Sequence, residues 1–284
     1  MKNNVPVNIP AEKLHPFEGH PFKVLDNDEM NQLIESIQEL GILSPLIVRP
    51  KENTTDEYEI VSGHRRFRAA VKAGMKEIPA FVVPMDRDAA AIALVDSNLH
   101  REHILPSEKA FAYKLKADAL NHQGKRNDLT SVQLAPKLAT EIIADEIGTS
   151  KDTIKRYIRL TNLIPEILQK VDDGQIALTP AVELSYLTEQ EQQDLLEAME
   201  CEDCTPSLSQ AVQLKKLSQA GVLDVDTIVT MMSQPKANQQ EKISFRVDDL
   251  RKYFPKSYDT TKIQETILKL LNDYQKRRQL DQAR

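Results

Sequence analysis

The stretch Ser62–Ala70, with the sequence Ser-Gly-His-Arg-Arg-Phe-Arg-Ala-Ala, constrains its surroundings more than any other part of the chain. An alternating apolar run at 57–61 precedes it and predicts a strand, and a helical pattern follows it and ends at Gly74. Gly63 therefore stands at a strand-to-helix turn. A residue without Cβ lets backbone N–H groups approach a ligand closely at such a turn.

Arg65, Arg66 and Arg68 fall in the first turns of this predicted helix. Cations are unfavourable there because the helix dipole favours anions at its N-terminus. Guanidinium groups bind phosphate oxygens in pairs, so the combination predicts a polyphosphate site. A solvated basic helix start is the alternative, and composition does not separate the two.

The length of 284 residues predicts two or more domains. No apolar run approaches the roughly 20 residues that span a bilayer, and the first residues lack an apolar signal core. We therefore expect a cytoplasmic protein that does not contact the membrane. The only cysteines, Cys201 and Cys204, lack the further ligands of a zinc site, so we expect two free thiols.

The net charge of −6 argues at first against a nucleic-acid partner, but its distribution does not. Residues 100–170 carry 12 basic and 9 acidic residues, a net of +3, and residues 242–284 carry 11 and 6, a net of +5. Residues 171–241 carry 3 and 13, a net of −10. Since local patches decide phosphate-backbone binding, two basic segments keep DNA binding open.

Residues 1–105 mix both kinds of secondary structure and predict a small mixed α/β domain. Prolines and weak periodicity at 15–24 predict a loop. The apolar patterns predict strands at 5–9, 46–49, 57–61 and 78–83, and helices at about 28–40, 64–73 and 86–99.

Polar side chains gather where the helix at 86–99 ends. Asn98 and Arg101 lie in this break, before Ser107 caps a long helix that is expected to reach about residue 122. An amide oxygen suits a hard metal ion and a guanidinium suits phosphate, so the break is expected either to complete a site or to be an exposed hinge.

The stretch 138–160 has the spacing of a helix-turn-helix, placed at about 140–159. Ala144 lets two helices cross closely, Gly148 makes the turn, and Ser150 caps the second helix. That helix is expected to pack Ile154, Tyr157 and Ile158 inward. The residues expected to reach bases and phosphates in a major groove are Thr149, Ser150, Lys151, Asp152, Lys155 and Arg156.

The rest of the chain predicts a helix that starts after residue 164 and a second helix with Thr179 as its N-cap and Pro180 at its first position. Three further helices are predicted at 188–199, 207–220 and 226–232. The tail predicts a strand at 243–247 and an amphipathic helix at 260–278, with Ile263, Leu270, Leu271 and Tyr274 among its inward residues. So short a unit is expected to dock, either on the body or on a second copy.

The order of these motifs resembles the ParB/Spo0J family of DNA-partition proteins. The first box of that family is similar to Gly41–Arg49, and its arginine box is similar to Gly63–Ala69. Asn98–Pro106 resembles its third box, and the helix-turn-helix and Arg159–Pro165 match as well. The resemblance covers roughly residues 5 to 190, and the tail is not a clear match to the usual dimerisation domain.

The resemblance implies an α+β protein of three parts. Residues 1–105 are expected to form a ParB/sulfiredoxin-like nucleotide-binding domain, 106–234 an all-α DNA-binding domain, and 235–284 a strand-helix segment for dimerisation or docking. It further implies a homodimeric clamp that binds CTP and a palindromic site on double-stranded DNA, with a ParA-type ATPase as partner and nucleoid association in the cytoplasm.

Carried over residue by residue, the resemblance gives the nucleotide to Gly63, His64, Arg65, Arg66, Arg68, Asn98 and Arg101. It places magnesium at Asn98. His64 stands where the family usually has glutamate, and Ser97 where an acid often helps to hold magnesium. These departures put slow CTP hydrolysis in doubt and leave a transcription regulator without nucleotide turnover as the alternative. A third possibility is an enzyme of another kind on the same scaffold, such as a nuclease. The sequence argues against it, because no paired carboxylates with an activated nucleophile accompany the arginine box.

Overall fold

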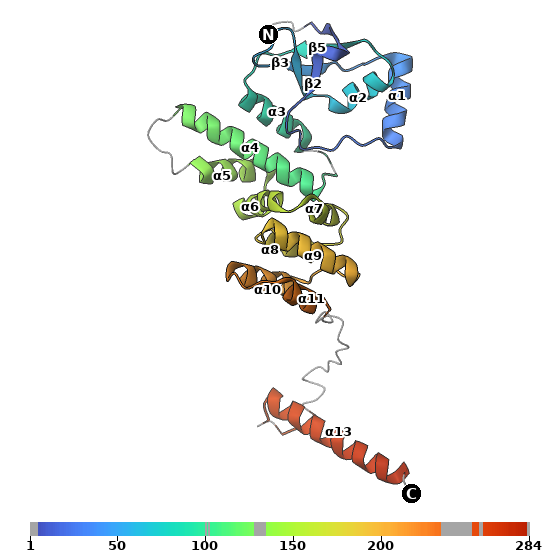
Figure 1. The fold of residues 1–284 in the computed structure, drawn as a ribbon, viewed down its shortest axis with the longest axis vertical. Helices are drawn as coiled ribbons and strands as arrows, with labels where there is room; N and C mark the ends of the chain where they lie inside the picture. Colours follow the sequence, from blue (N-terminus) through green and yellow to red (C-terminus); the bar gives the residue numbers. More distant parts are fainter. Residues whose placement is uncertain are drawn as a thin grey trace. The chain divides into compact units, whose positions relative to one another are not determined.

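The computed structural model of the chain describes residues 5–99, 101, 103–127, 135–233, 252–255 and 258–282. The chain divides into two compact units, Met1–Gln234 and Pro235–Arg284. Figure 1 follows the first unit from an α/β part near the N-terminus into a run of helices.

A five-stranded mixed sheet forms the centre of the α/β part, with the strand order β1-β5-β3-β4-β2. β1 pairs antiparallel with β5 and β3 antiparallel with β4, whereas the β3–β5 and β2–β4 pairs are parallel. The strands are β1 (Val7–Pro10), β2 (Leu14–Pro16), β3 (Leu46–Pro50), β4 (Tyr58–Ser62) and β5 (Glu77–Val82).

The expected strands at 5–9, 46–49, 57–61 and 78–83 are present with shifted ends, whereas β2 was expected to be a loop. The prediction missed β2 because three residues that end in a proline carry no period-2 signal. β2 lies at the edge of the sheet, where proline is tolerated since it has no N–H to donate.

Helices cover both faces of this sheet. α1 (Asp28–Leu40) and α2 (His64–Lys72) pack against one core with Leu46, Ile60 and Ile78, all fully buried. α3 (Arg87–Leu99) packs on the other face through Leu94 and Val95, against Val61 of β4. The single strand β4 therefore separates two cores, and α2 begins directly at its end.

The remaining helices of the first unit stack in successive layers (Figure 1). A core with Leu160, Ile167, Leu184 and Leu195 fully buried joins most of them, and a smaller core with Ile143 and Ile154 joins the helix at 135–147 to its two neighbours. They are α4 (Pro106–Asn127), α5 (Ala135–Ile147), α6 (Lys151–Arg159), α7 (Pro165–Asp172), α8 (Leu178–Leu184), α9 (Glu189–Cys201), α10 (Leu208–Gln219) and α11 (Val225–Ser233). Neither Cys201 nor Cys204 is in a disulfide, and Cys204 Sγ donates to the Met232 carbonyl at 3.5 Å.

The start of α8 corrects a prediction. Thr179 was expected to cap the helix, but α8 begins one residue earlier, at Leu178, with Ala177 as its N-cap. The Thr179 hydroxyl instead accepts a hydrogen bond from Arg156 at 2.7 Å. A contact with another helix has replaced the local cap that the sequence favoured.

In the second unit, the structure describes the helix α13 (Thr260–Gln282). The predicted strand at 243–247 lies outside the described residues. Ile263 is buried as expected, whereas Leu270, Leu271 and Tyr274 are 60%, 57% and 65% exposed, so the single chain does not cover the face that was expected to point inward. Among the helices of the described ranges, none combines the length and the apolar character that crossing a bilayer needs.

A cationic pocket and a helix-turn-helix as candidate functional sites

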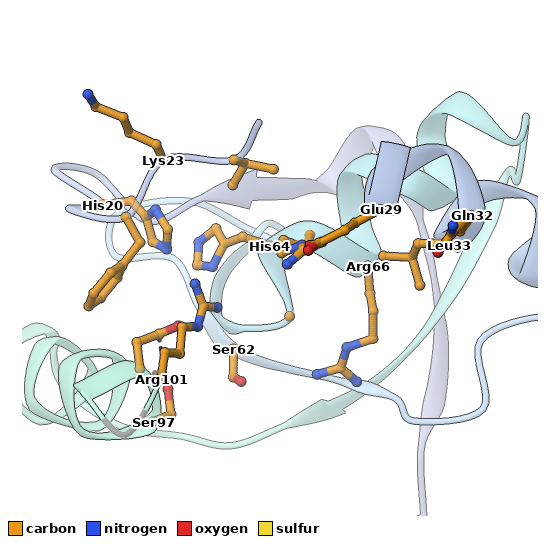
Figure 2. A pocket seen from close by; sticks show the side chains of 15 residues that line it. His20, Lys23, Glu29, Gln32, Leu33, Ser62, His64, Arg66, Ser97 and Arg101 are labelled. Atoms are coloured by element: carbon orange, nitrogen blue, oxygen red, sulfur yellow. Dashed lines mark hydrogen bonds and ion pairs between the residues drawn. The ribbon is translucent and has the colours of Figure 1, made fainter. Parts of the chain in front are cut away.

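A pocket of about 530 Å³ opens at the N-terminus of α2, within the range of about 300–1,000 Å³ usual for small-molecule sites (Figure 2). The loop after β2, α1, the turn after β4 and the end of α3 enclose it. Its lining residues include Gly63, His64, Arg65, Arg66, Asn98 and Arg101, together with His20, Lys23, Glu29, Ser62 and Ser97.

Gly63 is required at the turn between β4 and α2. Its φ of 104° and ψ of 24° lie in the left-handed region, which other residues rarely adopt. A Cβ at this position would lie 2.7 Å from Cδ2 of Leu46 and 3.2 Å from Nη2 of Arg66. Both the backbone angle and the space therefore demand glycine, and the turn brings the first N–H groups of α2 to the pocket.

Arg65 and Arg66 line the pocket in different ways. Arg65 Nη2 forms an exposed ion pair with Glu29 Oε2 of α1 at 2.8 Å, a contact that is easily exchanged. Arg66 Nη1 donates to the backbone carbonyls of Ser44 and, at 3.0 Å, Pro45. Burial lowers the pKa of Arg66. Both guanidinium groups are held in place while an open cavity remains beside them.

Arg68 lies outside this lining. Its Nε and Nη2 donate to the two carboxylate oxygens of Asp26 at 2.8 and 2.6 Å, and Lys72 pairs with the same carboxylate at 2.7 Å. The hydrogen bonds from Arg68 and then Lys72 hold the pKa of Asp26 well below its usual range. Of the seven residues predicted to bind nucleotide, the structure gathers six around the pocket and leaves Arg68 engaged behind it.

Asn98 and Arg101 close the pocket on the side of α3. Asn98 is buried, and its Nδ2 donates to the Leu94 carbonyl at 2.7 Å and to Ser97 Oγ at 3.2 Å. The guanidinium carbon of Arg101 lies 5.6 Å from the ring centroid of Phe22, a cation–π contact. Burial, followed by the charge of Arg65, lowers the pKa of Arg101.

His20 and His64 form a stacked pair in the wall of the pocket, with ring centroids 3.8 Å apart and planes at 37°. Burial, followed by the charges of His20 and Arg101, lowers the pKa of His64 to about 3. Burial also lowers the pKa of His20 to about 4, although a hydrogen bond with the backbone of Phe22 opposes the shift. Both rings are therefore neutral at pH 7. Sequence reasoning missed His20 because the loop that carries it has no periodic pattern.

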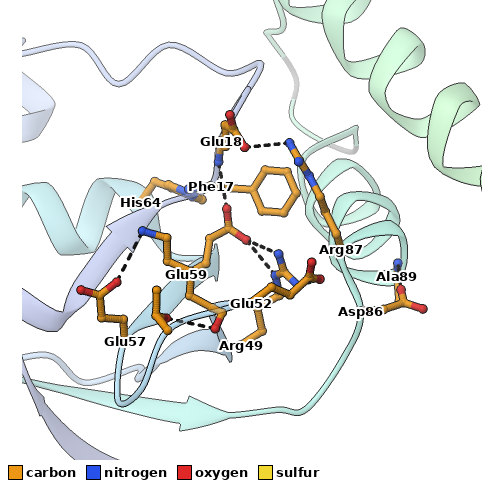
Figure 3. A network of polar contacts seen from close by, with 12 residues as sticks. Phe17, Glu18, Arg49, Glu52, Glu57, Glu59, His64, Asp86, Arg87 and Ala89 are labelled. Atoms are coloured by element: carbon orange, nitrogen blue, oxygen red, sulfur yellow. Dashed lines mark hydrogen bonds and ion pairs between the residues drawn. The ribbon is translucent and has the colours of Figure 1, made fainter.

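A polar network fixes the loop at Phe17 and Glu18, shortly before His20 in the chain (Figure 3). Buried Glu59 of β4 accepts from Arg49 Nε at 2.7 Å and from the Glu18 N–H at 3.0 Å. One residue earlier, the Phe17 N–H donates to His64 Nε2 at 3.3 Å. The loop is thus tied to the sheet and to the first residue of α2.

The pocket does not supply a magnesium site by itself. Magnesium in proteins takes carboxylates, waters and substrate phosphates as ligands. Among the residues that the structure describes, Glu29 is the one carboxylate of the lining, and it pairs with Arg65. Within the described ranges, no group of three or more His, Cys, Asp or Glu side chains is placed to hold a metal. Magnesium at Asn98 remains a prediction.

The predicted helix-turn-helix corresponds to α5 and α6. Gly148 has a φ of 72°, and the Thr149 N–H donates to the Ala144 carbonyl at 2.9 Å, which closes the turn. Ser150 Oγ caps α6 by accepting from the Thr153 N–H at 3.1 Å. Ile154 is fully buried, so the inward face of α6 is as predicted.

The outward face of α6 is polar and charged. Lys151, Asp152, Lys155 and Arg156 are exposed, Thr149 is partly exposed, and the exposed Ser150 serves as the cap. Lys151 pairs with Glu141 of α5 at 3.0 Å, and Arg156 is oriented by Thr179. Exposed pairs of this kind release easily, so these cations remain able to meet a phosphate backbone.

Two polar links connect the pocket side of the unit with the helical side. Lys23 Nζ pairs with Asp172 of α7 at 2.9 Å, and the Lys23 N–H donates to Glu108 of α4 at 2.7 Å. Lys116 of α4 is 1% exposed and bridges Asp96 of α3 and Glu146 of α5. One buried cation therefore joins the helix that ends at the pocket to the first helix of the helix-turn-helix.

Two family models match the chain in the order in which the two sites occur. Residues 1–99 match the ParB N-terminal domain, and residues 116–218 match the ParB HTH domain. The chain is 36% identical over 171 residues to the chromosome-partitioning protein Spo0J of Thermus thermophilus, covering 60% of this chain and 56% of that protein. It is 33% identical over 196 residues to the nucleoid occlusion protein of Listeria innocua, covering 68% of this chain and 62% of that protein. The matched part is thus less than two thirds of either relative's length.

Solved structures of a ParB protein are also similar. The C-terminally truncated chromosome-partitioning protein ParB from Caulobacter crescentus, complexed with CTP-gamma-S, gives a TM-score of 0.33 and 28% identity over 64% of this chain and 92% of that chain. Its complex with the centromeric parS site gives a TM-score of 0.40 and 24% identity, and the match covers 80% of this chain and 98% of that chain. Since both TM-scores are below 0.5, we base the assignment on the family models and the curated relatives: the chain belongs to the ParB/Spo0J family of partition proteins.

Proposed function

We propose that this chain is a partition-type DNA-binding protein that binds CTP in the pocket at Gly63 and a specific site on double-stranded DNA through α6. The observation that carries the proposal is the open cavity in which a glycine turn, the α2 N-terminus and the guanidinium groups of Arg65, Arg66 and Arg101 meet. Backbone N–H groups and cations in this arrangement match a triphosphate.

CTP as the nucleotide follows from the family, since the side chains of the pocket specify phosphate more clearly than they specify a base. Arg65 and Arg66 would hold the phosphates, with Asn98 and Arg101 completing the site from the other side. Arg68 would join them only if it exchanged Asp26 for the nucleotide. CTP supplies the negative charge that this cationic pocket lacks.

Clamp formation is the further part of the proposal. A palindromic DNA site requires two copies of α6, so the protein would act as a homodimer. The exposed apolar residues of α13 are consistent with a second copy in that place, because exposed apolar faces mark contact surfaces. CTP would close the dimer around DNA, a ParA-type ATPase would be the partner in segregation, and the protein would be associated with the nucleoid.

A transcription regulator without nucleotide turnover is the second candidate, and a specific observation favours it. His64 lies in the pocket wall where the family usually has glutamate, and a neutral imidazole does not replace a carboxylate as a ligand for magnesium. We therefore expect CTP hydrolysis to be slow or lost even if CTP is bound.

Calorimetry with CTP, ATP, GTP and UTP, each with and without a duplex selected from random DNA, tests both candidates. The clamp predicts that CTP binds selectively and that cognate DNA changes its affinity, because coupling between two sites is reciprocal. The regulator predicts DNA binding that no nucleotide alters. DNA binding together with CTP binding that is independent of DNA would contradict the coupling but not the pocket.

A further inference from the structure

His20 and His64 face the same cavity but differ in how their ring nitrogens are used. His64 Nε2 accepts the Phe17 N–H at 3.3 Å. That nitrogen must therefore remain unprotonated, and the proton of the neutral ring belongs on Nδ1. A second proton on His64 would break this hydrogen bond, so His64 is fixed in its neutral form.

His20 lacks such a constraint. It makes its hydrogen bond with the backbone of Phe22, and this bond raises the pKa because a charged ring donates more strongly than a neutral one. Burial and the charge of Arg101 oppose it and keep the ring neutral in the free protein. Burial and Arg101 both lower the pKa of His20, and of these two effects a bound anion would cancel the repulsion from Arg101.

The charges that face His20 are mainly positive. His20 lines both the nucleotide pocket and a second cavity on the far side of α2. The cations that line these two cavities are Lys23, Arg65, Arg66, Arg68, Lys72 and Arg101. Among the described residues, the carboxylates of the two linings are Glu12 and Glu29. Glu29 is already paired with Arg65, and Arg68 and Lys72 are paired with Asp26, which lies outside the linings. An incoming polyphosphate would reverse the sign of the local field.

We infer that His20 is a further phosphate-binding residue, and that it takes up a proton when a nucleotide triphosphate enters the pocket. The inference rests on the proposed function and adds to it a ligand and a pH dependence. Bound phosphate would pair with Arg101 and His20 together, and the ring would change from a neutral wall of the pocket into a cationic ligand.

Calorimetry at pH 6 in two buffers of different ionisation enthalpy measures proton uptake directly, with CTP at constant magnesium concentration. We expect the wild type to take up about half a proton or more per CTP relative to His20→Gln, which removes the titrating ring and keeps a polar side chain. Between pH 5.5 and 7.5 the Kd of the wild type should rise about fourfold to tenfold relative to that of the variant. Taking the difference between the two proteins cancels the titration of CTP itself.

His64→Gln is the matched control, since it changes the neighbouring ring of the same pair. It should alter CTP affinity but keep the proton uptake, and His20→Asn should repeat the result of His20→Gln. Thermal unfolding at pH 7.5 checks that each variant is folded.

Proton uptake that persists in both His20 variants, or that disappears only in His64→Gln, would overturn the inference. CTP binding by the wild type without any proton uptake would overturn it alone. If the wild type binds no nucleotide at any pH, the proposed nucleotide function fails and this inference fails with it.

Discussion

Gly63 shows how far a single residue determines the site. Replacement by alanine combines an unfavourable φ with a contact of 2.7 Å to Leu46. We expect Gly63→Ala to lower the free energy of unfolding by about 2–4 kcal/mol and to abolish nucleotide binding, because α2 must shift at the pocket. Chemical denaturation and calorimetry measure the two effects.

Gly74→Ala is the matched control for this prediction. Gly74 has a φ of 79°, but a Cβ there would meet nothing within 4 Å, so only the backbone penalty applies, about 1 kcal/mol. An equal loss of stability in the two variants would show that the space around Gly63 does not matter.

Arg66 and Arg68 belong to the same motif but occupy different surroundings. Arg66→Ala should remove a charge-assisted contact to phosphate worth about 1.5–3 kcal/mol, a tenfold to hundredfold loss of CTP affinity. Arg68→Ala should cost less, because Arg68 pairs with Asp26 in the free protein and its gain on binding is offset. Equilibrium binding of labelled CTP measures both. DNA binding without nucleotide should survive in each, and its loss in Arg66→Ala would make the motif structural.

The stacked histidines also affect stability. Their pKa values are lowered in the folded protein to about 4 and about 3, from 6.5. The unfolded chain therefore binds more protons below pH 6.5, and the stability that is present above this pH falls progressively towards pH 4. We expect the pair to contribute on the order of 2–4 kcal/mol of this loss. Urea unfolding at pH 7.5 and pH 5 should show a smaller pH dependence for the double variant His20→Gln/His64→Gln.

The residues that could be predicted were those with a local signal. Gly63 and the arginines stand together in sequence, and the left-handed turn and the helix start are properties of neighbouring residues. His20 comes from a loop whose position depends on contacts with Glu59 and His64, about 40 residues away. Arg68 has the same local signal as Arg66, and its pairing with Asp26 became visible only in the folded chain.

At the scale of elements, the same distinction explains what was right and what was wrong. The helix-turn-helix was predicted because Ala144, Gly148 and Ser150 act within a few residues of each other. The strand β2 was missed because its pairing with the parallel strand β4 overrides the local preference for a loop. The start of α8 was missed because the guanidinium group of Arg156 on α6 takes the Thr179 hydroxyl that was expected to cap the helix.

Lys116 connects three helices and gives a prediction for how they are held together. Lys116→Met keeps the buried stem but removes the cation between Asp96 and Glu146. Both carboxylates are about half exposed, so water would compensate part of the loss, and we expect about 1–3 kcal/mol of destabilisation rather than the larger cost of a fully buried pair. Denaturation of the variant measures it.

Lys114→Met on the same helix is the control for Lys116→Met, since Lys114 is exposed. It should change stability by less than about 0.5 kcal/mol. If the two variants were equally stable, the bridge would contribute nothing to the packing of α3, α4 and α5.

At the scale of the whole first unit, both sites lie on one connected body. The link from Lys23 to Asp172 begins in the pocket lining and ends on α7, which follows the helix-turn-helix in the chain. A nucleotide phosphate that attracted Lys23 would weaken this link. The reciprocal coupling proposed above therefore has a physical route that needs no change in the fold of either part.

The charge of the whole molecule leads to the last prediction, on salt dependence. DNA binding by a chain with a net charge of −6 must depend on a local basic surface, and α6 exposes Lys155 on the proposed DNA face. Lys155→Ala should weaken binding to all DNA sequences and lower the slope of log K against log salt by about one, because one phosphate contact is lost. Lys216→Ala removes the same charge from an exposed position on α10, in the acidic segment, and should leave the slope unchanged. Fluorescence anisotropy from 50 to 300 mM salt, about the range over which counterion release is resolved, compares the two. Equal slopes would place the DNA-binding surface elsewhere than on α6.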